Sequence, residues 1–206
     1  MKKNSLNVPN TLSLIRALLV PVFVAVLLFM REIYIFGIIV PTVVYIWTGL
    51  TDMLDGKIAR KYNLVTDFGK FIDPLADKFM VIGSQIAILV WMMLNAMDSG
   101  LKCDLYLPLV FVWVVLIILL RELGVTSLRL VVAGKSGIVV AASMLGKIKT
   151  VSQMAGTVII LVEPLIPFFN GNHILSYVCM AVMAFTTLFS GIDYLRAYLP
   201  HIDTSK

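Results

Sequence analysis

Six long apolar runs, separated by charged or turn-forming residues, constrain this chain more than any other feature. They cover residues 12–30, 34–54, 71–95, 105–133, 138–168 and 173–197. A helix needs about 20 apolar residues to cross the hydrocarbon core of a bilayer, so each run is long enough for one crossing. Of the 206 residues 60% are hydrophobic and 14% are charged, whereas soluble domains carry roughly a quarter charged residues. We therefore predict an all-α integral membrane protein, with one domain over residues 1–206 that forms a six-transmembrane-helix bundle.

The segment before the first run, residues 1–10, is short and partly charged. It contains Lys2 and Lys3 together with the apolar Leu6 and Val8. This composition predicts an N-terminal interfacial segment that dips into the headgroup layer, and a tail without fixed structure is the alternative.

The basic residues indicate how the bundle is oriented. Six crossings put both termini on one side, and of the 17 Lys and Arg residues only Arg31 and Lys102 fall on the other side. Short cytoplasmic loops are enriched in Lys and Arg, so we expect both termini in the cytoplasm. The net charge of +5 then needs no nucleic-acid partner.

Four aspartates lie close together where the second run ends and the third begins. Asp52 and Asp55 are three residues apart, and Asp73 and Asp77 are four apart, so each pair shares one helical face. Ionisable groups beside membrane spans are costly and persist mainly where they have a function. Carboxylates favour hard cations such as Mg²⁺ or Mn²⁺. The spacing predicts a metal site on the side of both termini, where four carboxylates hold two divalent cations about 4 Å apart.

Small and basic residues follow the first aspartate pair. Gly56 inside a helix costs roughly 1 kcal/mol relative to alanine, which indicates close approach of a ligand or of a neighbouring helix. Ala59, one turn later, is also small. Arg60 is placed to bind a phosphate or to pair with a carboxylate.

The order DxxDGxxAR, eight residues, GxxxDxxxD resembles the signature of the CDP-alcohol phosphatidyltransferase family, and every fixed position is filled. The resemblance implies that Asp52, Asp55 and Asp73 bind two divalent ions at the CDP pyrophosphate. It implies that Asp77 is the catalytic base and a further contact to the metal. It also implies nucleotide-binding positions in the helix, at Gly56, Ala59 and Arg60, and in the following loop, at Asp67 and Gly69. CDP-diacylglycerol is then the donor substrate, in a bacterial cell membrane, and a homodimer is possible.

A set of basic residues in the second half suggests the acceptor. The stretches VPNTLSLIR and GKIKTVSQ, with the pair Arg121-Glu122, resemble the branch of this family that makes phosphatidylglycerophosphate. Basic side chains suit an acceptor that carries a phosphate, such as glycerol 3-phosphate. We predict that this phosphate is bound by Arg121, Arg129, Lys135, Lys147 and Lys149. The alternatives are that Arg121 pairs with Glu122 or an aspartate, and that Lys147 and Lys149 extend to the membrane interface.

Three rival functions remain. Membrane prenyltransferases also use aspartate-rich helices with Mg²⁺, but on two well-separated helix pairs. An ion transporter needs carboxylates near the bilayer midplane on several helices, and Glu163, which we place near the end of the fifth span, is the main acidic residue outside the cluster. Within the family, inositol phosphate, serine or phosphatidylglycerol are the competing acceptors.

Overall fold

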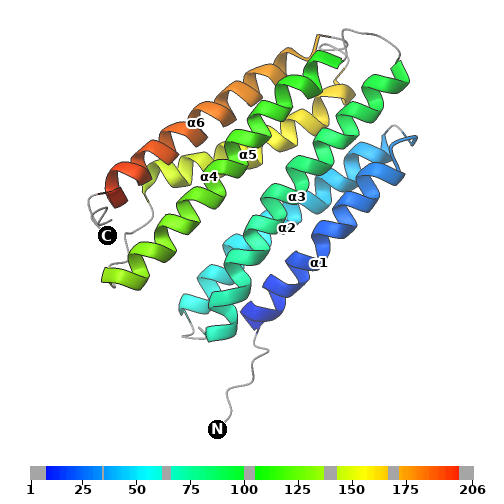
Figure 1. Ribbon diagram of the computed structural model, residues 1–206. Coiled ribbons are helices and arrows are strands. Elements are labelled where there is room, and N and C mark those ends of the chain that lie inside the picture. The colour runs from blue at the N-terminus through cyan, green and yellow to red at the C-terminus, as the bar shows by residue number, and fades with distance from the viewer. Residues whose placement is uncertain are drawn as a thin grey trace. The chain divides into compact units, whose positions relative to one another are not determined.

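The computed structural model describes residues 8–33, 35–61, 66–99, 105–136, 143–166 and 172–199. Within these ranges the chain forms helices and no strands (Figure 1). The helices are α1 (Val8–Phe29), α2 (Phe36–Lys61), α3 (Asp67–Ser99), α4 (Tyr106–Ser136), α5 (Met144–Val162), the short 3₁₀ helix η2 (Glu163–Leu165) and α6 (Ile174–Tyr198). They form two compact units, Met1–Leu105 and Tyr106–Lys206, each described by itself below. The prediction of one domain stays a prediction.

Each α-helix corresponds to one apolar run, but the helices begin and end at other residues than the runs do. α1 begins at Val8, so residues 8–10 form one continuous helix with the first apolar run. Residues 1–7 lie outside the described part, and the interfacial segment stays a prediction. α2 and α3 extend past their apolar runs to Lys61 and back to Asp67, because helical hydrogen bonding continues where the apolar pattern stops. The fifth helix ends at Val162, earlier than predicted.

Five of the described helices are long and apolar enough to cross a membrane. The exception is α2, whose apolar part is Phe36–Thr51, because the charged signature begins at Asp52. Large apolar side chains such as Leu18, Trp47, Trp113 and Phe185 are more than 60% exposed, which suits contact with lipid. The chain is a multi-pass membrane protein, and its orientation in the membrane stays a prediction.

In the first unit, α1 packs against both α2 and α3. Val20, Phe23 and Leu27 lie three or four residues apart on one face of α1 and are almost completely buried. The ring of Phe23 lies 5.8 Å from that of Tyr45 on α2. On α3, a Cβ at Gly83 would lie 2.8 Å from Cγ1 of Val20, so glycine permits the close approach of α1 and α3.

Side-chain bonds at both ends show that α1 and α3 run in the same direction. Near their N-terminal ends, Ser13 Oγ donates to Asp73 Oδ1 at 2.5 Å. Near their C-terminal ends, Arg31 Nη1 donates to Asp98 Oδ2 at 2.6 Å. The second aspartate pair of the signature therefore lies beside the beginning of α1.

In the second unit, α6 packs against both α4 and α5. A Cβ at Gly156 of α5 would lie 2.6 Å from Sδ of Met183, so the glycine allows the Met183 side chain to pack directly against α5. One turn away, Gln153 Nε2 donates to Thr187 Oγ1 at 3.0 Å. Such bonds between membrane helices contribute about 0.6 kcal/mol each.

Glu163 closes the connection between α5 and α6. Its buried carboxylate accepts hydrogen bonds from the backbone N–H groups of Leu175 and Ser176, both at 2.8 Å, and from the Ser176 hydroxyl. The first N–H groups of a helix have no partners within it, and negative charge is favoured there. The prediction that Glu163 lies at the end of the fifth span is confirmed, and the residue caps the next helix.

Candidate active site

The first half of the signature lies on the last turns of α2. The helix runs unbroken to Lys61 and includes the predicted positions Asp52, Asp55, Gly56, Ala59 and Arg60. Their side chains lie outside the described residues. The helical backbone nevertheless puts positions 52 and 55 on one face of α2, as predicted.

The second half of the signature begins with the N-terminal turn of α3. Thr66 precedes the helix, and its Oγ1 accepts a hydrogen bond from the backbone N–H of Gly69 at 3.0 Å. This is the geometry of an N-cap, which starts a helix by satisfying a free backbone N–H. The prediction that Asp67 and Gly69 lie in a loop is therefore wrong, since both belong to the first turn of α3. The side chain of Asp67 lies outside the described residues.

Gly69 has a steric explanation in the structure. A Cβ on this residue would lie 2.5 Å from Oδ1 of Asn10 and 3.3 Å from Oγ1 of Thr66. Asn10, on the first turns of α1, is 2% exposed and its Nδ2 donates to Thr66 Oγ1 at 2.7 Å. The glycine thus allows α1 to contact the beginning of α3.

Asp73 and Asp77 follow one and two turns later on one face of α3. Asp73 is exposed and Asp77 is half-buried. One oxygen of Asp73 accepts the hydrogen bond from Ser13 on α1. The second aspartate pair is therefore accessible at the side of α3 that meets α1.

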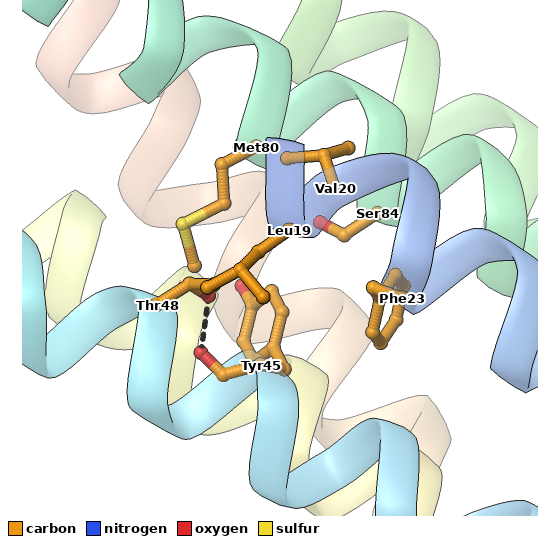
Figure 2. A pocket seen from close by; sticks show the side chains of 7 residues that line it. All are labelled: Leu19, Val20, Phe23, Tyr45, Thr48, Met80 and Ser84. Carbon is orange, nitrogen blue, oxygen red and sulfur yellow. Dashed lines mark hydrogen bonds between the residues drawn. The ribbon is translucent and has the colours of Figure 1, made fainter. Parts of the chain in front are cut away.

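A small pocket lies between the three helices of the first unit (Figure 2). It is lined by residues of α1, α2 and α3, namely Leu19, Val20, Phe23, Tyr45, Thr48, Met80 and Ser84. On α2, positions 45, 48, 52 and 55 form one stripe with steps of three and four residues, and on α3 positions 73, 77, 80 and 84 do the same. Each aspartate pair therefore lies on the same helical face as two residues that line this pocket, Tyr45 and Thr48 on α2 and Met80 and Ser84 on α3.

The donors of this region suit a divalent cation. All are carboxylates, which hard cations prefer, and the Ser13 hydroxyl holds Asp73 in the way that metal-binding carboxylates are usually held by a second hydrogen bond. Among the residues whose side chains are described, no three acidic, His or Cys groups gather into one cluster. The side chains of Asp52 and Asp55 are not among the residues described.

In the second unit, two of the predicted acceptor residues share one carboxylate. Glu122 Oε1 accepts from Arg121 Nη1 at 3.1 Å and from the Lys149 ammonium. Arg121 Nη2 also donates to Ser190 Oγ at 2.7 Å. Lys149 is 4% exposed and Glu122 is 7% exposed. The alternative that Arg121 pairs with Glu122 is confirmed, and the alternative that Lys149 extends to the interface is wrong.

Tyr194 of α6 organises the neighbouring turn. Its hydroxyl accepts from Arg129 Nη2 at 2.6 Å and from the backbone N–H of Ser143 at 3.2 Å. The guanidinium carbons of Arg129 and Arg121 lie 4.8 Å and 5.2 Å from the centre of its ring. Tyr194 thereby joins α4, the N-cap of α5 and α6, and brings both arginines to one end of the unit.

The other two predicted acceptor residues lie on α5 and α4. Lys147 is exposed on the first turns of α5, and Lys135 lies on α4 with its side chain outside the described residues. We name the side chains of Arg121, Glu122, Arg129, Lys149 and Tyr194 the basic cluster. Their role toward an acceptor stays a prediction.

Three residues with central positions were not among the predicted site residues, namely Ser13, Asn10 and Tyr194. A usable signal existed for two of them. Asn10, Ser13 and Arg16 recur every three residues in an otherwise apolar helix, which is the pattern of a polar face turned toward a neighbouring helix. Tyr194 carries no comparable signal, because tyrosine is common in membrane helices.

Comparisons with known proteins agree with the signature. The family model described as CDP-alcohol phosphatidyltransferase matches residues 6–189. The CDP-diacylglycerol–glycerol-3-phosphate 3-phosphatidyltransferase of Bacillus subtilis is 35% identical over 97% of this chain and 99% of its own length. A probable phosphatidylglycerophosphate synthase of Mycobacterium tuberculosis is 35% identical over 95% of this chain and 83% of its own. The Pseudomonas fluorescens protein with the same name as that of B. subtilis is 33% identical over 97% of this chain and 93% of its own.

Proposed function

Since the chain belongs to the CDP-alcohol phosphatidyltransferase family, we propose that it transfers the phosphatidyl group of CDP-diacylglycerol to sn-glycerol 3-phosphate. The products are phosphatidylglycerophosphate and CMP. The observation that carries this proposal is the near full-length similarity to relatives whose names state that reaction. The complete signature on α2 and α3 supports the family chemistry.

In this reaction the acceptor hydroxyl attacks the phosphorus that carries the diacylglycerol group. A new P–O bond forms to the acceptor, and the P–O bond to CMP breaks. Two divalent cations, Mg²⁺ or Mn²⁺, held by Asp52, Asp55, Asp73 and Asp77, would neutralise the pyrophosphate and the leaving CMP. Asp77 would take the proton of the attacking hydroxyl. Gly56, Ala59, Arg60, Asp67 and Gly69 would line the nucleotide site.

The charge of the basic cluster supports an acceptor that bears a phosphate. Arg121 and Lys149 bond directly to the carboxylate of Glu122, and Arg129 is joined to Arg121 through their shared contact with Tyr194. Three cations around one anion leave two positive charges, which suits a phosphate dianion. Free serine as the acceptor carries no phosphate, so these two positive charges would not strengthen its binding.

The proposed location is the bacterial cell membrane, with both termini and the active site on the cytoplasmic side. The excess of basic residues on that side supports this orientation. The water-soluble substrate, glycerol 3-phosphate, and the water-soluble product, CMP, then both remain in the cytoplasm.

The acceptor is tested by CMP release from the purified protein. With CDP-diacylglycerol and Mn²⁺, we expect CMP only when glycerol 3-phosphate is added. Serine, inositol phosphate and phosphatidylglycerol are supplied in parallel. Equal CMP release with any of these three would overturn the acceptor assignment.

The base is tested by Asp77→Asn, with Asp98→Asn as the matched control at the other end of α3. Asp98 is an exposed carboxylate that pairs with Arg31. We expect Asp77→Asn to remove turnover but to retain binding of the CDP-lipid, and we expect the control to keep both. Turnover by Asp77→Asn would refute the role of this residue as base.

A further inference from the structure

The beginning of α1 carries a polar face that the proposed chemistry does not use. Asn10, Ser13 and Arg16 are spaced by three residues, and all three are at most 2% exposed. Burying polar groups inside a membrane protein costs free energy unless they are hydrogen-bonded. Their retention in an apolar helix therefore indicates specific partners, and the structure identifies two of these on α3.

The first partner is Asp73. Ser13 Oγ donates to Asp73 Oδ1 at 2.5 Å, across 60 residues of sequence. A hydroxyl has one hydrogen to donate, so it restrains one carboxylate oxygen and leaves the other available to a cation. Because serine is neutral, it orients the carboxylate without cancelling the negative charge that a cation needs.

The second partner is the N-cap of α3. Asn10 Nδ2 donates to Thr66 Oγ1 at 2.7 Å, and the same oxygen accepts from the backbone N–H of Gly69. Asn10 and Ser13 lie about one turn apart on α1, and Thr66 and Asp73 lie about two turns apart along α3. Two contacts at different heights fix both the rotation and the axial position of α3 relative to α1.

We propose that Ser13 is a positioning residue that holds Asp73 in the orientation required for divalent-cation binding, while Asn10 keeps the first turns of α3 in register with α1. The inference deepens the proposed function and rests on it, because Asp73 is one of the proposed cation ligands. A packing role alone would make Ser13 important for stability and irrelevant to cation affinity.

The test measures Mn²⁺ affinity directly, without turnover. The full-length protein in detergent, with CDP present and no lipid substrate or acceptor, is titrated with Mn²⁺, and the free ion is followed by its electron paramagnetic resonance signal. We expect Ser13→Ala to weaken Mn²⁺ binding by about 10–100-fold, the usual effect of losing such a supporting hydrogen bond. Ser13→Thr retains the hydroxyl and should restore most of the affinity.

The matched control is Thr42→Val, which removes a buried hydroxyl of the same unit. Thr42 Oγ1 donates to the carbonyl of Ile38 in its own helix, and residue 42 is about 15 Å along α2 from residue 52. We expect this variant to bind Mn²⁺ like the unsubstituted protein. Thermal unfolding without Mn²⁺ should be similar for Thr42→Val and Ser13→Ala.

Several outcomes would overturn the inference. They are an unchanged Mn²⁺ affinity in Ser13→Ala, a loss that matches the loss of folded protein, or no recovery in Ser13→Thr. If Ser13→Ala does not fold, Ser13→Cys replaces it, because a thiol is a weak donor and an affinity equal to that of serine would refute the role.

The outcomes also separate this inference from the proposed function. The expected Mn²⁺ pattern without glycerol 3-phosphate-dependent CMP release would refute the acceptor assignment and leave the role of Ser13 supported. CMP release that depends on glycerol 3-phosphate, together with an unchanged Mn²⁺ affinity in Ser13→Ala, would support the acceptor assignment and refute the role of Ser13. Failure of the unsubstituted protein to bind Mn²⁺ would refute both the cation site and the role of Ser13.

Discussion

Removing the charge of Glu122 should destabilise the second unit strongly, because two cations depend on one of its oxygens. Glu122 Oε1 accepts from Arg121 at 3.1 Å and from Lys149. The side chains of Lys149, Glu122 and Arg121 are 4%, 9% and 12% exposed. Water has little access to replace the lost carboxylate, and the buried Lys149 ammonium would lose its bond to the Glu122 charge.

Breaking a buried ion pair by removing one partner costs about 3–5 kcal/mol. For a chain of 206 residues we expect Glu122→Gln to lower the unfolding temperature by roughly 6–20 °C. The double variant Glu122→Gln with Lys149→Met removes both buried charges and should recover most of that loss, since a packed apolar side chain replaces an ion pair at little cost.

The assay is thermal unfolding in detergent, combined with CMP release. If Lys149 also binds the acceptor phosphate, the double variant regains stability but keeps a raised KM for glycerol 3-phosphate. Asp98→Asn, which removes an exposed carboxylate, serves as control and should change the unfolding temperature little. A Glu122→Gln protein as stable as the unsubstituted one, or a double variant no more stable than the single one, would refute this reasoning.

Three further predictions concern the contacts around the site. Gly69→Ala should impair activity because its Cβ would collide with Asn10 Oδ1, and adding Asn10→Ala should restore part of the CMP release; no restoration would mean that Gly69 is needed by the ligand instead. Tyr194→Phe should cost about 0.5–1.5 kcal/mol of stability, the net value of a typical hydrogen bond, because the bond from Arg129 to the hydroxyl is lost. Thermal unfolding measures this against Tyr177→Phe, an exposed tyrosine of the same helix, and equal effects would contradict it. Chelation with EDTA should abolish CMP release, and excess Mg²⁺ or Mn²⁺ should restore it; activity that survives chelation would refute the cation requirement.

The structure changes how the predicted acceptor residues are interpreted. From the sequence, Arg121 and Lys149 were either phosphate ligands or residues with structural partners. Both residues form ion pairs with Glu122, so they have a structural role. The net positive charge near Tyr194 is compatible with phosphate binding as well. Lys147, which is exposed, is the residue whose loss should alter acceptor binding with the least effect on stability.

Much of the fold and the family was predictable from the sequence because the evidence is local. A run of about 20 apolar residues is enough to indicate a membrane helix, and six such runs correspond to the six α-helices among the described residues. The aspartate signature is also local, since its spacing on α2 and α3 follows from 3.6 residues per turn. The family comparisons confirmed the resemblance that this spacing indicated.

Other features depend on contacts between residues far apart in the chain, which no local pattern contains. Ser13 meets Asp73, Asn10 meets Thr66, and Glu122 meets Lys149 across 60, 56 and 27 residues. The sequence by itself determined the spans, the carboxylates and the family. The tertiary structure decided which polar groups are buried together, because a side chain inside a membrane protein must find its partner on a neighbouring helix, and helix packing determines which one it meets.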